Sequence, residues 1–462
     1  MELQGKHVLV LGLGESGLAC ARWCARQGAR VRVADTRTVP PYLDELRRGI
    51  ATAEFVAGEF DRKLLDGIDL LALSPGLPGG LTLVTEARAA GIPVVGEIEL
   101  FARGLRIAGD ATPVLAITGT NGKTTTTELT GHLLRATGKT VGIAGNISPA
   151  TLAALMAAQD AHALPQIWVL ELSSFQLETT ETLNPAAATV LNISEDHLDR
   201  YSDIDEYASA KARIFQSAGG ARGVQVLNRD DPRVRRMAQA GRHVVTFGLD
   251  APVAGEDFGL RPNRGEAWLV QGERLLLPVS ELPLAGLHNA ANAMAALALC
   301  TSLGFDANAL LPGLRSFRGL PHRVEKIAEL DGVGWYDDSK GTNVGATVAA
   351  LQGLGRKVVL ILGGDGKGQD FSPLMSVVTQ HARAVILVGR DGPLIEKAIA
   401  GAGVTTENAS GMDDAVRRAS LLAQPGDAVL LSPACASFDM FRNYEHRAQV
   451  FVAAVRALGG RA

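Results

Sequence analysis

Short runs of apolar residues alternate with amphipathic stretches along almost the whole chain. An apolar run at residues 7–11 is followed by helix-like spacing over 15–27 and by a second apolar run at 31–34. Short apolar runs are typical of strands buried on both faces, and strands that alternate with helices predict parallel sheets covered by helices. The pattern therefore predicts an α/β protein.

The alternation continues through three units, which a length of 462 residues also favours at about 150 residues per domain. We expect further strands at 70–73 and 93–95 and helices at 43–48 and 82–90 in the first unit; strands at 114–117, 167–170 and 187–191, antiparallel hairpins within 258–279 and a helix at 289–303 in the second; and strands at 358–362, 384–388 and 428–431 with helices at 413–423 and 445–458 in the third. We place the domains at 1–101, 102–319 and 320–462.

Charge and cysteine content narrow the class of protein. A net charge of -4 argues against a nucleic-acid-binding protein, which usually has an excess of positive charge. The four cysteines, Cys20, Cys24, Cys300 and Cys435, have the spacing of neither a zinc site nor a disulfide framework. The first residues do not resemble a signal peptide, and no run approaches the roughly 20 apolar residues that span a bilayer. We therefore expect a cytoplasmic protein with reduced thiols and no membrane contact.

The strongest local motif lies between a predicted strand and a predicted helix. It reads TGTNGKTT and comprises Thr118, Gly119, Thr120, Asn121, Gly122, Lys123, Thr124 and Thr125. In such a loop the backbone N–H groups and the helix N-terminus face a phosphate, the lysine reaches the β- and γ-phosphates, and the hydroxyl after it binds Mg²⁺. The loop is shorter than the common P-loop, because Gly119 precedes Gly122 by three residues. The alternative, a glycine-rich turn with an incidental lysine, explains neither the preceding strand nor the following helix.

Glu171 ends the next apolar strand. A carboxylate at a strand end beside a phosphate loop can hold Mg²⁺, which prefers hard oxygen ligands. Ser173 or Ser174 alternatively makes this segment the cap of a helix, and both interpretations can hold together.

His197 follows the strand at 187–191 in an acidic turn, where it is a candidate metal or phosphate contact. A single histidine is more often structural, and Asp196 and Asp199 are equally good helix caps. Lys211 lies on a predicted helix, and its spacing alone indicates only a solvated face.

A second glycine loop, Gly12–Gly17, matches G-x-G-x-x-G after a strand and before a helix. Asp35 ends the following strand, where a Rossmann fold holds a ribose hydroxyl with an acid. NAD, FAD or a UDP-sugar would each fit this pattern. Arg37 contacts a phosphate or faces solvent, and the turn Ser74–Gly76 lines the same site or is a plain loop. Two nucleotide-type loops in one chain indicate two nucleotide ligands.

Taken together, these motifs resemble the muramyl ligase family over essentially the whole chain. The resemblance rests on TGTNGKTT, on ELSSFQLE at 171–178, NISEDHLDRY at 192–201, GLHNAANAMAA at 286–296, PHRVE at 321–325, DDSKGTN at 337–343 and LGGDGKGQDF at 362–371. GLGESG, SPG, GEIEL at 96–100 and SPACASFDMF at 432–441 are similar to the members that add D-glutamate. The resemblance implies Rossmann-like first and third domains around a P-loop-type ATPase domain with a parallel sheet.

The resemblance also implies roles for individual residues. ATP and magnesium would be bound by the phosphate loop together with Asn289, Asn292, Arg323 and Asp338, and two Mg²⁺ ions by Thr124, Glu171, His197 and Lys211, the lysine as a carbamate. Lys123, Glu171, His197 and Lys211 would be the catalytic residues. D-glutamate would be held by Lys340, Thr342, Lys367, Ser437 and Tyr444, and the UDP-muramyl substrate by Gly14, Ser16, Asp35, Thr36, Arg37, Ser74, Gly76 and Asn146.

The implied reaction is ATP-dependent ligation through an acyl-phosphate, as a cytoplasmic step of peptidoglycan synthesis by a monomer that acts on small molecules. Three residues depart from the family pattern: Gly341 stands for alanine, Tyr444 for phenylalanine, and Glu15 places an acid beside the expected diphosphate. We expect the Glu15 side chain to point away from that diphosphate.

Several alternatives stay open. A related ligase would add another amino acid, or glutamate to folate, although the nucleotide-fitted first domain speaks against folate. An NAD-dependent dehydrogenase would use Gly12–Asp35 but leaves the phosphate loop unexplained, and a non-catalytic nucleotide-binding module would show no turnover.

Overall fold

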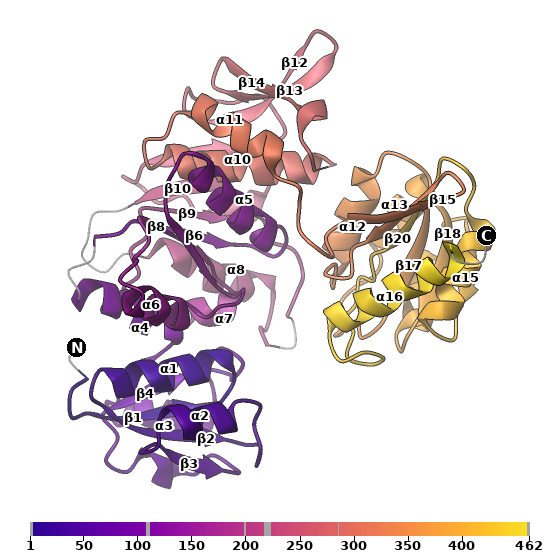
Figure 1. The fold of residues 1–462 in the computed structure, drawn as a ribbon. Helices are drawn as coiled ribbons and strands as arrows, with labels where there is room; N and C mark the ends of the chain where they lie inside the picture. Colours follow the sequence, from indigo (N-terminus) through magenta and orange to yellow (C-terminus); the bar gives the residue numbers. More distant parts are fainter. Residues whose placement is uncertain (1–2, 108–110, 198–199, 217–222, 285, 460–462) are drawn as a thin grey trace.

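The computed structural model describes residues 3–107, 111–197, 200–216, 223–284 and 286–459. Three sheets follow one another along the chain, each covered by helices (Figure 1). This confirms the predicted α/β class with three domains.

The first sheet has five parallel strands in the order β3-β2-β1-β4-β5. Its elements are β1 (His7–Leu11), α1 (Glu15–Arg26), β2 (Arg30–Asp35), α2 (Leu43–Gly49), β3 (Glu54–Ala57), η1 (Arg62–Leu65), β4 (Leu70–Leu73), α3 (Thr82–Ala89), β5 (Val94–Val95) and α4 (Glu97–Ile107). The order changes direction at β1, so the turns after β1, β2 and β4 meet at one edge, which is where ligands bind in such sheets.

The central sheet has nine strands in the order β14-β13-β12-β11-β10-β9-β6-β8-β7. Its elements are β6 (Val114–Thr118), α5 (Lys123–Ala136), β7 (Val141–Gly145), α6 (Thr151–Asp160), β8 (Ile167–Glu171), α7 (Ser174–Leu177), β9 (Ala187–Val190), α8 (Ile204–Ala212), η2 (Arg213–Phe215), β10 (Val224–Asn228), α9 (Pro232–Arg235), β11 (Val244–Phe247), β12 (Phe258–Asn263), β13 (Glu266–Gln271), β14 (Arg274–Pro278), η3 (Val279–Glu281), α10 (Leu287–Thr301) and α11 (Ala307–Ser316). The strands from β7 to β12 are parallel, and β12, β13 and β14 form the expected antiparallel hairpins.

The third sheet has six strands in the order β15-β16-β20-β17-β18-β19, with only β15 antiparallel. Its elements are β15 (Glu325–Leu330), β16 (Val333–Asp337), α12 (Val344–Gly353), β17 (Val358–Gly363), α13 (Leu374–His381), β18 (Ala382–Val388), α14 (Gly392–Ile399), β19 (Thr405–Asn408), α15 (Met412–Leu422), β20 (Ala428–Leu431) and α16 (Tyr444–Gly459).

The strands and helices expected from the apolar pattern are all present, to within two residues at each end. Elements of mixed composition, such as β3 and β19, were not predicted because their exposed residues interrupt the apolar run. Helix α4 was not predicted either, and the predicted boundary between residues 101 and 102 falls inside it. The domain boundaries therefore stay predictions.

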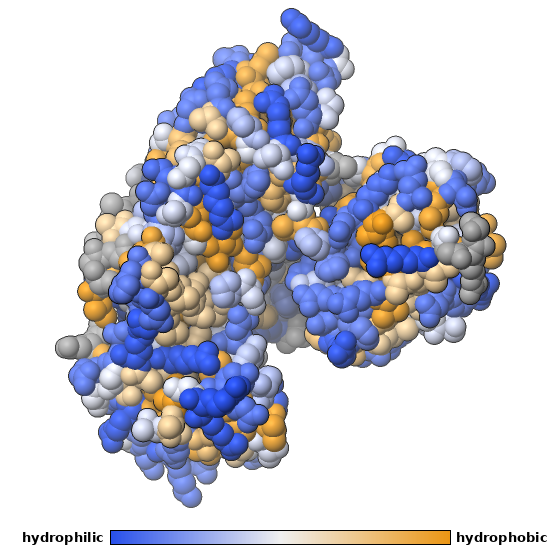
Figure 2. Space-filling view, viewed as in Figure 1, coloured by the Kyte–Doolittle hydropathy of each residue, from blue (hydrophilic) through white to orange (hydrophobic). Residues whose placement is uncertain are grey.

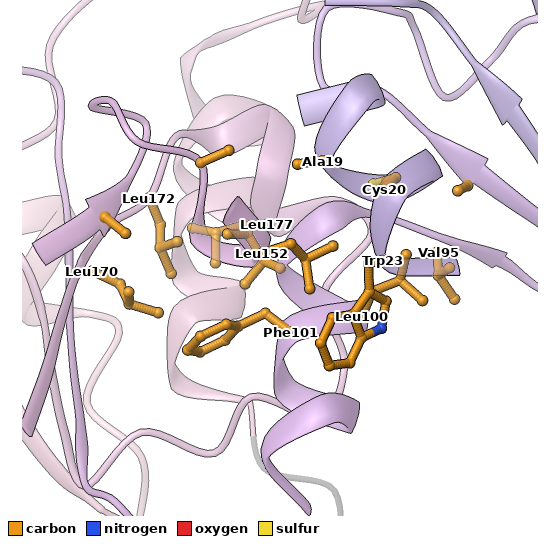
Figure 3. Packing of buried hydrophobic residues seen from close by; sticks show 14 of the residues in the cluster. Ala19, Cys20, Trp23, Val95, Leu100, Phe101, Leu152, Leu170, Leu172 and Leu177 are labelled. Carbon is orange, nitrogen blue, oxygen red and sulfur yellow. The ribbon is translucent and has the colours of Figure 1, made fainter. Parts of the chain in front are cut away.

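The first two domains share one hydrophobic core. Trp23 of α1, Phe101 of α4, Leu152 of α6 and Leu170 of β8 belong to a single buried cluster (Figure 3). The ring of Phe101 meets that of Trp168 edge to face, with centroids 5.4 Å apart. The clusters of the C-terminal domain contain only its own residues. Because apolar burial is the main attraction between packed elements, the first two domains form one unit and the third is the more independent.

Helix α6 is capped by the first domain. Its own first residues supply no side-chain cap. Instead, the Glu97 carboxylate accepts hydrogen bonds from the Thr151 hydroxyl and, at 2.6 Å, from the Leu152 N–H. Burial raises the pKa of Glu97 to about 7 despite these bonds, and its other oxygen has no partner among the described residues. Glu97 is therefore an acid that folding favours in its protonated form.

Replacing Glu97 by glutamine is expected to make stability less sensitive to pH. The pKa of Glu97 is raised from 4.5, so between pH 4.5 and 7 the folded state holds a proton that the unfolded state releases, and stability falls as pH rises. Glutamine keeps the accepting oxygen but cannot ionise. The free energy of unfolding of Glu97→Gln should gain on wild type by up to about 3 kcal/mol between pH 5 and pH 8 in urea titrations.

Glu99→Gln is the matched control on the same helix. Burial opposes ionisation of Glu99, but hydrogen bonds from Glu181 and Thr182 and the Arg103 guanidinium hold its pKa below the ordinary value. Its loss should therefore cost most at neutral pH and least in acid. A stability difference for Glu97→Gln that does not vary with pH contradicts the protonated form.

Cys20, Cys24, Cys300 and Cys435 are all buried and unpaired. Among the described residues no helix combines the length and hydropathy needed to cross a membrane. On the face shown in Figure 2, hydrophobic residues are scattered among hydrophilic ones, and the molecule is hollowed between the C-terminal domain and the other two.

Candidate active site

A cavity of about 560 Å³ lies between the central and C-terminal domains. The predicted site residues that line it are Thr120, Asn121, Gly122, Lys123, Thr124, Thr125, Asn146, Glu171, His197, Asn289, Asn292, Arg323, Asp338, Lys340, Thr342 and Lys367. A smaller cavity of about 350 Å³ between α1 and α4 contains none of the predicted site residues. The structure thus gathers motifs from residue 120 to residue 367 around one space.

The phosphate loop joins β6 to α5. Lys123 is the first residue of α5, and its ammonium donates to the carbonyls of Gly119 at 2.8 Å and Thr120 at 2.7 Å. Gly122 has φ +82°, and a Cβ there would lie 2.4 Å from Asn292 Oδ1. A side chain at this position would therefore strain the turn and displace Asn292. The helix N-terminus and the lysine both face the cavity, as anion binding requires.

Glu171 lies at the end of β8, next to β6 in the sheet, and is 2 % exposed. One carboxylate oxygen accepts from Asn146 Nδ2 at 2.8 Å. The other, Oε2, is buried and has no partner among the described residues. An unpaired carboxylate oxygen beside a phosphate loop is a suitable ligand for a hard cation such as Mg²⁺. Ser173 caps α7 in a capping box with Gln176, so the cap and the carboxylate role coexist.

His197 has φ +56° and stands edge-on to the Phe175 ring, with centroids 4.8 Å apart. Burial lowers its pKa, which favours the neutral imidazole that can bind a metal. Asp196 accepts from the His197 N–H at 3.0 Å rather than capping a helix, and Asp199 lies outside the described residues.

Lys211 lies on α8 but is 1 % exposed, so the solvated face that its spacing indicated is wrong. Its ammonium lies 3.5 Å from Thr118 Oγ1 and 4.6 Å from the centroid of the Tyr207 ring. Among the described residues no carboxylate forms an ion pair with it. Burial and then the nearby Lys123 charge lower its pKa well below the ordinary value. The charges of Asp196 and Glu171 oppose this shift, but neither carboxylate pairs with the ammonium, so burial prevails and the neutral amine is favoured.

The C-terminal domain reaches the phosphate loop through Arg323. Its guanidinium donates to Thr124 Oγ1 at 2.6 Å. Asp338 is buried and accepts from the Ser432 hydroxyl at 2.7 Å, and burial raises its pKa to about 7. A side chain at Gly341 would clash with Asp338, because its Cβ would lie 2.6 Å from Asp338 Oδ2.

The residues predicted to hold D-glutamate are only partly gathered. Lys340, Thr342 and Lys367 line the cavity, and the Lys340 ammonium lies 3.7 Å from the centroid of the Tyr444 ring. Burial lowers the pKa of Lys340 to about 8. Ser437 is buried and, like Tyr444, does not line the cavity itself.

The residues predicted to hold the UDP-muramyl substrate lie at the edge of the first sheet. Asp35 accepts from the Leu13 N–H at 2.8 Å and pairs with the Arg37 guanidinium, which holds its pKa at about 2. The Ser74 hydroxyl donates to the Gly12 carbonyl at 2.9 Å. Of the predicted set, Gly14, Ser16, Asp35, Thr36, Arg37, Ser74 and Gly76 do not line the central cavity, whereas Asn146 does.

Two contacts that the sequence did not suggest connect this edge to the central domain. Glu15 accepts from Ser148 Oγ at 2.8 Å and from the Ala150 N–H at 3.1 Å, so its carboxylate points to the central domain. The Arg200 guanidinium donates to the carbonyls of Pro75 and Leu77. Such contacts between distant segments leave no local signal in the sequence.

His322, Glu325 and Asp337 place three possible metal-binding atoms within 4.8 Å of one another. The ring nitrogen Nδ1 of His322 lies 2.6 Å from Asp337 Oδ2. The backbone N–H of His322 donates to Glu325 Oε2 at 2.9 Å. These internal hydrogen bonds account for the cluster without a cation.

Three segments match families described as the MurD-like N-terminal domain of Mur ligases over residues 6–96, the Mur ligase middle domain over 117–300 and the glutamate ligase domain of Mur ligases over 322–435. A UDP-N-acetylmuramoylalanine--D-glutamate ligase of Aromatoleum aromaticum is 60% identical, with 99% of this chain and 98% of the relative covered. The enzyme of the same name from Nitrosospira multiformis is 56% identical, with 99% and 97% covered.

Solved structures show the same fold at lower identity. UDP-N-acetylmuramate-alanine ligase MurC of Thermotoga maritima aligns with a TM-score of 0.59 at 21% identity, over 98% of this chain and 99% of that chain. MurF of Acinetobacter baumannii aligns with a TM-score of 0.62 at 19% identity, over 98% and 91%.

Proposed function

Because this chain belongs to the Mur ligase family, we propose that it is the ATP-dependent ligase that adds D-glutamate to UDP-N-acetylmuramoyl-L-alanine in peptidoglycan synthesis. The relatives that are 60% and 56% identical over nearly their full length bear the name of that enzyme. The observation that most supports it is the shared cavity, in which Lys123 and Glu171 face Lys340 and Lys367 of the C-terminal domain.

In the first step a carboxylate oxygen of the alanyl group attacks the γ-phosphorus of ATP, and the bond to the ADP oxygen breaks. The acyl-phosphate and ADP result. Lys123 and the α5 N-terminus would hold the phosphates and neutralise charge on the transferred group. Magnesium, when bound, supplies further positive charge at these oxygens. The residues that would hold it are Thr124, Glu171 and His197, and the unpaired Glu171 Oε2 fits that role.

In the second step the neutral amine of D-glutamate attacks the acyl carbon, phosphate leaves with the electrons of the C–O bond, and the amine loses a proton. Lys340 and Lys367 would pair with the two carboxylates of D-glutamate, and Thr342 would add a hydroxyl. Ser437 and Tyr444, predicted for the same ligand, lie outside the cavity lining. Closure of the C-terminal domain would exclude water, which otherwise hydrolyses the acyl-phosphate.

Lys211 would act as a carbamate. The nitrogen of its neutral amine forms a bond to the carbon of CO₂ and loses a proton, which leaves a carbamate whose oxygen anion can bind magnesium. The burial of Lys211 beside Thr118, with no ion pair to a described carboxylate, supports this modification.

The UDP end would lie against the first sheet. The glycine loop at Gly14 and Ser16 would face the diphosphate, with Asp35 already holding the loop at the Leu13 N–H. Asn146 would touch the muramyl end while it orients Glu171.

An amino-acid panel tests the proposal. Protein with magnesium, ATP and UDP-N-acetylmuramoyl-L-alanine is offered D-glutamate, L-glutamate, L-alanine or L-lysine, and ADP is measured. The rate of ADP formation with D-glutamate should exceed that with each other amino acid by at least about 100-fold. A site that pairs two carboxylates rejects analogues in which one carboxylate is missing or misplaced. ADP release that is indifferent to D-glutamate, or to the UDP substrate, would remove the proposal.

A further inference from the structure

One asparagine of the C-terminal domain contacts the phosphate loop directly. Asn343 is 6 % exposed and precedes α12, where its Oδ1 accepts from the Ala346 N–H at 2.9 Å as a helix cap. Its Nδ2 donates to Asn121 Oδ1 at 3.0 Å and lies 3.4 Å from Asp196 Oδ2. The side-chain oxygen of Asn343 therefore caps a helix of its own domain, while the side-chain nitrogen binds the central domain.

Asn121 is arranged to receive this contact. Its N–H donates to Asn192 Oδ1 at 2.8 Å, and Asn192 Nδ2 donates to its carbonyl at 3.1 Å. The backbone of Asn121 is thus fixed within the central domain, and its side chain faces α12. Gly345 makes the approach possible, because a Cβ there would lie 2.9 Å from Asn121 Nδ2.

The contact matters because the C-terminal domain shares no hydrophobic cluster with the other two. Besides the packing of α12 against the start of α10, polar contacts hold it over the phosphate loop, among them those of Arg323 with Thr124 and of Asn343 with Asn121. Asn343 also follows Lys340 and Thr342, so the same short segment joins the proposed D-glutamate contacts to the loop that would hold ATP.

We propose that Asn343 is a positioning residue that latches the C-terminal domain onto the phosphate loop and so aligns the amino acid with the transferred phosphate. This inference rests on the proposed function for its substrates. Asn343 lines the same cavity, and the role proposed for it acts through Asn121: closure of the domain is the step that it favours.

Asn343→Asp separates the latch from the cap. Aspartate caps helices as well as asparagine does, so α12 keeps its N-terminus. Aspartate at this position cannot donate to Asn121, and it places a negative charge beside Asp196.

We expect the Kd of ATP, measured calorimetrically with magnesium, and the KM of D-glutamate each to rise about tenfold, which corresponds to losing one buried hydrogen bond. The Kd of the UDP substrate should not change, because its proposed site lies in the fused first two domains.

Asn408→Asp is the matched control, because it adds the same charge to the same domain at an exposed position on β19. It should leave ATP binding unchanged. If Asn343→Asp keeps the wild-type Kd of ATP and KM of D-glutamate, the latch is refuted. An equal loss of affinity for the UDP substrate refutes it as well. Should Asn343→Asp fail to fold, Asn343→Ser, which also caps but is too short to reach Asn121, decides by the same binding measurement. Wild-type protein that forms no ADP with D-glutamate would refute the function, while ATP binding still tests the latch.

Discussion

Replacing Lys123 by alanine is expected to lower kcat for ADP formation by about 10³-fold, since a cation placed on the transferred phosphoryl group is worth roughly that much. The carbonyls of Gly119 and Thr120 position the Lys123 ammonium at the N-terminus of α5. Burial lowers the pKa of Lys123, and the charges of Glu171 and Asp196 oppose that effect. Its charge is therefore poorly solvated, which strengthens its interaction with a phosphate. Single-turnover ADP formation with saturating ATP measures the loss.

Lys139→Ala is the control for this experiment. Lys139 follows the same helix, is exposed, and does not line the cavity. It should retain wild-type kcat. A Lys123→Ala protein that folds normally and keeps a tenth or more of wild-type activity would show that this loop does not grip the transferred phosphate.

The sequence places Lys123, Glu171 and His197 together because each follows or ends an apolar strand, whereas Asn289, Asn292 and Arg323 entered the predicted site only through the resemblance to the family. Lys123 follows β6 and Glu171 ends β8, and these strands are neighbours in one parallel sheet. Parallel strands bring their carboxyl ends to one edge, so residues 48 positions apart in the chain meet there. In the first sheet, Asp35 at the end of β2 and the glycine loop after β1 likewise meet at one edge, where the Leu13 N–H donates to Asp35.

The sequence could not predict contacts that depend on how domains pack. The burial of Lys211 follows from α8 lying against Thr118, and nothing in the spacing of α8 indicates it. The motif GEIEL contains Glu97, but nothing in its local pattern indicates that the Glu97 carboxylate caps α6 of another domain. Asn343 caps α12 in the structure, and its second partner lies 222 positions away in the sequence. Local patterns thus specify strands, caps and loops, whereas side-chain partners across domains require the coordinates.

Replacing Lys211 by alanine should be the second large loss, of about 10²- to 10³-fold in kcat. Alanine removes the proposed carbamate, and magnesium would then have one oxygen ligand fewer to hold it against the transferred phosphate. The modification itself gives a direct readout. Wild-type protein in ¹³C-bicarbonate should show a carbamate carbon resonance that Lys211→Ala lacks, because the carbamate forms only on a neutral amine and burial favours that form.

Removal of CO₂ separates the modification from a purely structural role of the lysine. Wild-type protein exchanged into CO₂-free buffer should lose activity and regain it when bicarbonate is added, whereas Lys211→Ala should respond to neither. Lys63→Ala, a lysine on η1 of the first domain, should behave as wild type throughout. Lys211 is buried against Thr118 and the Tyr207 ring, so a structural lysine would lower the melting temperature when replaced but would leave wild-type activity indifferent to CO₂. That indifference, together with an absent carbamate resonance, would refute the modification and leave Thr124, Glu171 and His197 as the proposed protein ligands of the metal.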